Sequence, residues 1–312
     1  MADKANRASW GDLLAAEVRA KASPLVVGID PRLSSLPPQL RAQGEAGLEA
    51  AGEAFATFGK AVIDAVAEHT AVVKPQAAFF EQLGVPGMIA LQQVITHARS
   101  AELLVLLDGK RNDIGSTAAG YADAYLGQQS AWGADALTVS PYLGSDSLTP
   151  FADVCEERGA GMFVLVKTSN PGGGEFQDLS TGDENGPRLY ERVAMLVESL
   201  AERSAGASGY GAVGAVVGAT YPEQLSELRS QMPHAWLLIP GFGAQGGSAA
   251  DTAGGFHANG LGAIVNSSRG VIFAYDRPEY AGAANWQDAV AAAARDAKLQ
   301  LLAETPAGTL SG

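Results

Sequence analysis

An apolar run ends in Asp108, Lys110 and Asp113 within residues 104–117, LVLLDGKRNDIGST. Strand side chains alternate between faces, so Asp108 and Lys110 should project together from the end of a buried strand, with Asp113 just beyond. An ammonium buried between carboxylates is costly unless the charges compensate one another, and such clusters occur at sites of chemistry. A lone Asp-x-Lys is more often a structural ion pair. The full string Asp-x-Lys-x-x-Asp-Ile-x-x-Thr favours an active site.

Other predicted strands also end in polar residues. The first ends in Asp30, the second in Lys74, the fifth in Lys167-Thr-Ser-Asn170 and the eighth in Asn266-Ser-Ser-Arg-Gly270. Because the carboxyl ends of parallel strands meet at one edge, these side chains are expected to surround a single site.

Short apolar runs recur along the chain with helical stretches between them. The predicted strands are Leu25–Ile29, Ala71–Lys74, Leu103–Leu107, Ala136–Val139, Met162–Val166, Val213–Val217, Trp236–Ile239 and Ala263–Val265. Helical patterns fall between them, for example Leu48–Glu68, Val85–Ala98, Ala118–Gln128, Leu189–Arg203 and Pro222–Gln231, and Trp286–Ala303 closes the chain. Near-continuous apolar strands alternating with helices predict a parallel sheet covered on both faces, and eight units predict a (β/α)8 barrel.

The whole chain, residues 1–312, is expected to form one barrel domain. A leading amphipathic helix within residues 1–23 is expected to cover the amino-terminal mouth of the barrel. The glycine-rich stretch 172–186 is expected to be a long loop after the fifth strand, and residues 305–312 a disordered tail.

A doubly wound nucleotide-binding fold is the rival architecture. Gly241-Phe-Gly-Ala-Gln-Gly246 matches G-x-G-x-x-G, but no acidic residue follows about 20 residues later to hold a ribose. The segment fits better as a turn whose backbone amides bind phosphate, because barrels commonly bind phosphate after strands seven and eight.

Composition narrows the class of partner. The formal net charge of −13 argues against nucleic acid or an anionic membrane surface. No apolar stretch approaches the roughly 18 residues of a membrane helix, and the polar N-terminus carries no signal core, so a cytoplasmic protein is expected. Cys155 is the only cysteine, which excludes an internal disulfide and a cysteine-based zinc site.

The string from Asp108 to Thr117 resembles the signature of the orotidine 5′-phosphate decarboxylases. Supporting matches run from the first strand to the eighth: Gly28-Ile-Asp30, Val73-Lys-Pro75, Lys167-Thr-Ser-Asn-Pro171, Pro240-Gly-Phe-Gly-Ala-Gln-Gly-Gly247 and Ser268-Arg-Gly270. The chain is most similar to the larger, second group of the family. The resemblance implies decarboxylation of orotidine 5′-phosphate to uridine 5′-phosphate in pyrimidine nucleotide biosynthesis, without metal or cofactor, by a homodimer.

The resemblance also implies roles for the charged residues. Lys110 would protonate C6, and Asp108 would lie beside the substrate carboxylate. Asp113 would come from the partner subunit to complete an alternating array with Lys74, Asp108 and Lys110. Asp30 and Lys74 would bind ribose hydroxyls.

The remaining expected contacts complete the substrate site. Thr117 would reach the ribose bound by the partner subunit, and Ser169 would hydrogen-bond the pyrimidine. The phosphate would be held by Gln245, Arg269 and backbone amides at Gly246 and Gly270. Lys167 is expected to play a supporting structural role.

Two other functions stay open. A related barrel lyase acting on phosphosugars would share Asp-x-Lys-x-x-Asp but need a divalent metal, and no Glu stands near the motif to serve as a further ligand. A phosphate- or nucleotide-sensing barrel would bind its ligand without turnover. Loss of activity on adding a chelator would identify the metal-dependent lyase. Ligand binding without turnover would identify the sensing barrel.

Overall fold

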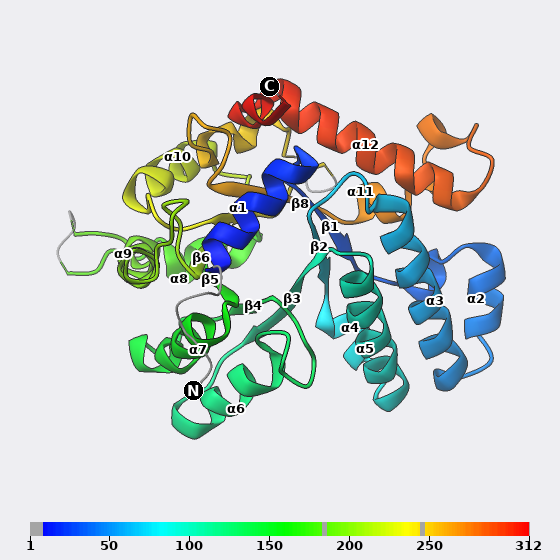
Figure 1. The fold of residues 1–312 in the computed structure, drawn as a ribbon, viewed down its shortest axis with the longest axis horizontal. Coiled ribbons are helices and arrows are strands. Elements are labelled where there is room, and N and C mark those ends of the chain that lie inside the picture. The colour runs from blue at the N-terminus through cyan, green and yellow to red at the C-terminus, as the bar shows by residue number, and fades with distance from the viewer. Residues whose placement is uncertain (1–8, 183–185, 244–246, 312) are drawn as a thin grey trace.

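Eight parallel strands close into a barrel in the order β1 to β8 (Figure 1). The computed structural model describes residues 9–182, 186–243 and 247–311. The strands are β1 Leu25–Ile29, β2 Val72–Pro75, β3 Leu104–Arg111, β4 Ala136–Val139, β5 Gly161–Lys167, β6 Val213–Val217, β7 Leu237–Ile239 and β8 Ala263–Ser267. Each lies on its predicted segment, so the (β/α)8 barrel prediction is confirmed.

Helices surround the barrel. The longer ones are α1 Trp10–Lys21, α2 Pro38–Gly44, α3 Leu48–Val66, α5 Val85–Ser100, α6 Gly115–Tyr125, α7 Ser145–Arg158, α9 Leu189–Arg203, α10 Pro222–Gln231 and α12 Trp286–Glu304. Short helices are α4 Ala77–Glu81, α8 Gly174–Gln177 and α11 Arg269–Ile272. Between β7 and β8, the described residues form the 3₁₀ helix η4, Ala250–Gly255, rather than an α-helix.

The leading helix α1 lies across the barrel at the amino ends of the strands (Figure 1). The Trp10 indole is fully buried and packs edge-on against Phe163 of β5, with ring centroids 6.5 Å apart. A Cβ atom on Gly161, at the start of β5, would lie 2.4 Å from that indole. The helix therefore lies opposite the strand ends that carry the charged residues.

The predicted disorder of residues 305–312 is contradicted over residues 305–311. Pro306–Ser311 forms the 3₁₀ helix η7, which packs on α12, and Ala307 is fully buried. Thr305 joins the two helices: its Oγ1 donates to the Leu301 carbonyl at 2.7 Å and accepts from the Ala307 N–H at 3.1 Å. A Cβ atom on Gly308 would lie 2.6 Å from the Leu302 carbonyl oxygen, so glycine lets the chain fold back closely here.

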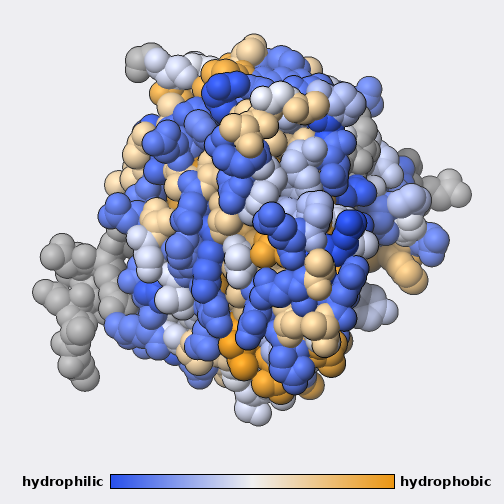
Figure 2. All heavy atoms as spheres, turned by 90° about the vertical axis from the view of Figure 1, so that its right-hand side faces the viewer, coloured by the Kyte–Doolittle hydropathy of each residue, from blue (hydrophilic) through white to orange (hydrophobic). Residues whose placement is uncertain are grey.

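The outer surface of the barrel is more hydrophilic than its core. Figure 2 shows a largely hydrophilic face, with hydrophobic residues gathered near its lower edge. Among the described residues, no helix is both long and apolar enough to cross a membrane.

A buried carboxylate joins β3 to the start of β4. Asp135 Oδ2 accepts a hydrogen bond from the Val105 N–H at 2.8 Å. Burial raises the pKa of Asp135 to about 6, although the hydrogen bond from Val105 and the charge of Arg99 both act to lower that pKa. A raised carboxyl pKa means that folding favours the protonated form. Its contribution to stability is therefore present at low pH and is lost as pH rises through about 6.

We expect Asp135→Asn to stabilise the protein at pH 8 by roughly 1–3 kcal/mol, because the amide keeps an acceptor without the buried charge. The gain should shrink towards zero near pH 4. Urea denaturation at both pH values measures it, with the exposed Glu157→Gln on α7 as the control. An equal effect at both pH values would show that ionisation of Asp135 is not the cause.

Candidate active site

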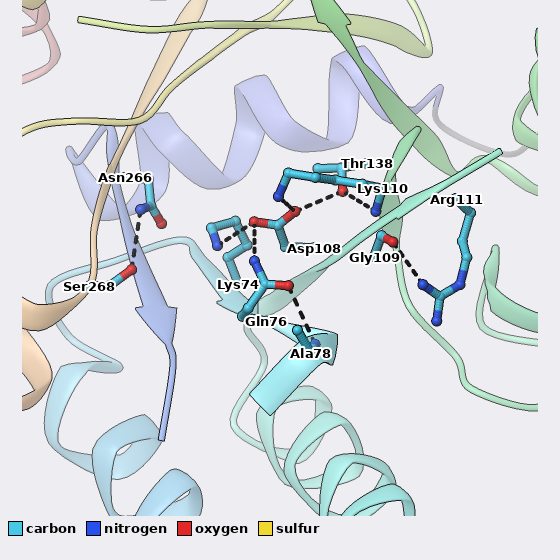
Figure 3. Close-up of polar contacts among 10 residues, drawn as sticks. All are labelled: Lys74, Gln76, Ala78, Asp108, Gly109, Lys110, Arg111, Thr138, Asn266 and Ser268. Atoms are coloured by element: carbon cyan, nitrogen blue, oxygen red, sulfur yellow. Dashed lines mark hydrogen bonds and ion pairs between the residues drawn. The ribbon is translucent and has the colours of Figure 1, made fainter. Parts of the chain in front are cut away.

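Two lysines, Lys74 and Lys110, gather around the carboxylate of Asp108 (Figure 3). Asp108, on β3, lies 2.9 Å from Lys74 Nζ on β2 through Oδ2 and 2.6 Å from Lys110 Nζ through Oδ1. Two neutral donors complete its shell: Gln76 Nε2 donates to Oδ2 at 3.0 Å and Thr138 Oγ1 to Oδ1 at 2.9 Å. Both carboxylate oxygens of Asp108 thus receive two hydrogen bonds.

The electrostatics of this cluster favour the charged forms of Lys74 and Asp108. Burial alone would lower the pKa of Lys74, but the charges of Asp108 and Asp30 outweigh it, and the pKa is raised. Burial would likewise raise the pKa of Asp108, but Lys74 and Lys110 hold it far below its ordinary range. The side chains of Lys74 and Asp108 are 6% and 11% exposed, whereas that of Lys110 is 48% exposed. Lys110 is therefore the most exposed of the three side chains.

A cavity of about 890 Å³ lies at the carboxyl ends of the strands. Its lining includes six of the residues that the sequence singled out: Asp30, Lys74, Asp108, Lys110, Ser169 and Arg269. The barrel thus brings together side chains from β1, β2, β3, the segment after β5, and the end of β8. This volume is large enough for a mononucleotide.

Three other predicted residues lie elsewhere. Within the described part of the chain, Asp113, Thr117 and Gly270 are not among the residues that line this cavity. The Asp113 carboxylate accepts from the Ile114 N–H at 2.8 Å, and Thr117 is exposed on α6. The predictions for Gln245 and Gly246 lie outside the described residues.

The strand-one and strand-eight ends approach one another closely. A Cβ atom on Gly28 would lie 1.9 Å from Ser268 Oγ, so only glycine leaves room for that hydroxyl. Asn266 Nδ2 donates to the same oxygen at 3.3 Å. Asn266 Oδ1 and Asp30 Oδ1 are buried acceptors without a hydrogen-bond partner among the described residues. Both residues line the cavity.

Lys167 lies behind the cavity wall. Its side chain is fully buried, forms an ion pair with Asp178 and lies under the rings of Tyr190 and Tyr221, at 5.2 and 4.9 Å. Lys167 is not among the described residues that line the cavity. These contacts are consistent with the supporting role expected from the sequence.

Sequence reasoning missed two residues that bind Asp108. Thr138 lies within the apolar strand β4, and Gln76 follows β2 two residues after Lys74. A polar residue inside an otherwise apolar strand was the available signal for Thr138, and the strand period of two was the signal for Gln76.

A closed (β/α)8 barrel with a lysine–aspartate–lysine cluster in a nucleotide-sized cavity at its carboxyl end defines a barrel enzyme. The orotidine 5′-phosphate decarboxylase / HUMPS family profile matches residues 23–284. The chain belongs to this family.

Individual relatives agree with the family match. A curated orotidine 5′-phosphate decarboxylase of Rhodopirellula baltica is 60% identical over 275 residues, which cover 86% of this chain and 90% of the relative. The orotidine 5′-phosphate decarboxylase of Haloarcula marismortui is 43% identical over 263 residues, covering 84% and 86%. The solved structure of Leishmania donovani OMP decarboxylase matches with a TM-score of 0.72 and 35% identity, covering 95% of this chain and 98% of that one.

Proposed function

We propose that this chain decarboxylates orotidine 5′-phosphate to uridine 5′-phosphate in pyrimidine nucleotide biosynthesis, using its own side chains without metal or cofactor. This activity is proposed because the chain belongs to the family and because a named relative, the decarboxylase of Rhodopirellula baltica, is 60% identical to it. The observation that carries the chemistry is the Lys74–Asp108–Lys110 cluster, with the Lys110 ammonium at the cavity.

In this proposal, the bond between C6 and the carboxylate breaks, carbon dioxide leaves, and the electron pair stays on C6. Lys110 donates a proton from Nζ to that carbon and is later reprotonated from solvent. The ammonium stabilises a charge that grows only towards the transition state, so its effect appears in the rate more than in ground-state binding. Asp108 holds the ammonium and would lie beside the substrate carboxylate.

The other cavity residues are assigned to binding. Asp30 and Asn266 carry acceptors without a partner among the described residues, which ribose hydroxyls would satisfy. Ser169 follows β5 and is assigned to the pyrimidine, while Arg269, at the end of β8, is assigned to the phosphate together with Gly270, Gln245 and Gly246.

The test is the consumption of orotidine 5′-phosphate in the presence of a chelator. We expect full turnover after dialysis against EDTA. A loss restored by Mg²⁺ would favour the metal-dependent phosphosugar lyase instead. Within the described part of the chain, no group of three or more His, Cys, Asp or Glu side chains is placed to hold a metal ion. Tight binding of uridine 5′-phosphate without turnover would favour a sensing barrel.

The homodimer is also part of the proposal. Large apolar side chains are exposed next to Asp113 and on the segment after β4: Ile114 is 56% exposed, Tyr142 80% and Leu143 46%. The two segments are adjacent, because the Ser140 N–H donates to the Arg111 carbonyl at 2.9 Å. This surface is suited to a second copy of the chain, whose cavity Asp113 and Thr117 would enter.

We expect a mixture of inactive Lys110→Ala and Asp113→Ala chains to regain up to about a quarter of the wild-type activity. Half of a randomly exchanged population is mixed dimer, and each mixed dimer holds one intact site. Turnover is measured after subunit exchange has been verified by mass spectrometry. The Lys110→Ala/Asp113→Ala double variant, mixed with wild type, is the control. No regain would place both residues in one subunit's site.

The cytoplasmic location expected from the sequence stays a prediction.

A further inference from the structure

The peptide bond between Gly109 and Lys110 is held at both ends by side chains (Figure 3). Arg111 Nη1 donates to the Gly109 carbonyl at 2.8 Å, and the Lys110 N–H donates to Thr138 Oγ1 at 2.9 Å. Both backbone groups belong to one peptide unit. In a regular strand these two groups would hydrogen-bond to the backbone of neighbouring strands. Here, side chains take the place of those backbone partners.

The reason is an irregularity in the pairing of β3 with β4. Leu107 pairs with Leu137, and the next pair is Arg111 with Val139. Residues 108–110 therefore lie opposite the single residue Thr138. Bulges of this kind redirect side chains and occur beside active sites.

The irregularity places Lys110 in an uncommon backbone conformation. Its φ angle is +44°, in the left-handed region that residues with a Cβ atom rarely adopt. Such a conformation is strained for a residue with a side chain and persists only where its surroundings fix it. The conformation accompanies a 2.6 Å contact from Lys110 Nζ to Asp108.

Arg111 is itself firmly held, on the side of the strand away from Asp108 (Figure 3). Its guanidinium lies over the rings of Tyr121 and Tyr125, at 5.8 and 5.4 Å. It also donates to Tyr125 Oη at 3.2 Å and forms an ion pair with Glu81. A planar guanidinium can serve these partners and the Gly109 carbonyl together, which a lysine ammonium cannot do in the same geometry.

We propose that Arg111 is a positioning residue for the reaction: it fixes the Gly109–Lys110 peptide and thereby directs the Lys110 ammonium at the reacting carbon. Thr138 holds the other end of the same peptide. This inference rests on the proposed function, because it assigns Arg111 a role through the proton donor. Arg111 is not among the described residues that line the cavity, so it acts without touching the substrate.

The test compares Arg111→Met with wild type in turnover and in affinity for uridine 5′-phosphate. A misplacement of about 1 Å can cost about 100-fold in rate, so we expect kcat to fall roughly 10- to 100-fold. Product affinity should stay within about threefold, because the product does not need the proton donor. Arg111→Lys should show the same split. Tyr125→Phe leaves the Gly109 contact intact and should keep kcat close to wild type.

Three results would overturn the inference. The first is an unchanged kcat in folded Arg111→Met. The second is a matching loss of product affinity, which would mean that Arg111 supports the whole cavity. The third is a crystal structure of the variant in which Lys110 keeps its left-handed backbone and its contact with Asp108, a result that does not depend on the reaction. If Arg111→Met does not fold, Arg111→Lys decides by the same measurements. A wild-type protein without turnover would instead reject the proposed function.

Discussion

Lys110→Ala is expected to lower turnover of orotidine 5′-phosphate by about 10⁴-fold or more. The change removes both a proton donor, worth about 10²–10⁴ in rate, and a fixed cation beside the developing charge, worth about 10²–10³. Affinity for uridine 5′-phosphate should change only severalfold, since the product carries neither the carboxylate nor the growing charge. Steady-state kinetics and calorimetric titration with the product measure the two effects.

The matched control for this variant is Lys60→Ala. Lys60 lies on α3 outside the cavity, and its Nζ donates to Gln93 at 2.8 Å. That substitution should leave both turnover and product affinity unchanged. If Lys110→Ala retained a tenth of wild-type turnover, Lys110 could not be the proton donor, and the assignment of the chemistry to this cluster would fail.

Arg269→Ala is expected to lower kcat/KM for orotidine 5′-phosphate by about 10²–10³, while having little effect on the phosphate-free substrate orotidine. A guanidinium about 4 Å from a phosphate charge interacts by roughly 4 kcal/mol at an effective dielectric near 20, before desolvation reduces it. Binding energy from such a remote group can lower the barrier at the reacting centre. The measurement is kcat/KM for both substrates in the wild type and in the variant.

Lys110→Ala provides the contrast for this experiment, because it should impair both substrates. Equal losses on the two substrates in Arg269→Ala would mean that Arg269 supports the fold or the chemistry. In that case, the phosphate would have to be assigned to other residues of the cavity.

The positions of the strands could be predicted closely because buried parallel strands appear in the sequence as short, nearly continuous apolar runs. The ends of β1 and β2 were predictable too, since Asp30 and Lys74 mark them to within one residue, whereas β3 continues past Asp108 to Arg111. The period of two also brought Asp108 and Lys110 together, and the structure places them in contact. No local sequence pattern indicated that this contact occurs within an irregular pairing of β3 with β4.

Contacts between strands were harder to predict from the sequence. The hydrogen bond from Thr138 to Asp108 depends on the register of β4 against β3, which no local pattern specifies. The packing of residues 305–311 depends on a surface of α12 that the tail's own composition does not describe. Local periodicity therefore located the site, while partners brought in from neighbouring elements had to come from the structure.

The four donors around Asp108 have a consequence for how the enzyme responds to acidity. A carboxylate bound by Lys74, Gln76, Lys110 and Thr138 has neither a free oxygen lone pair in easy reach of a proton nor room to rotate. Its pKa lies far below the ordinary carboxyl range, so it stays anionic throughout mildly acidic conditions. An acid limb in the pH–rate profile must then arise from other ionisations, such as that of the substrate phosphate, and the central anion works as a fixed charge rather than a titratable switch.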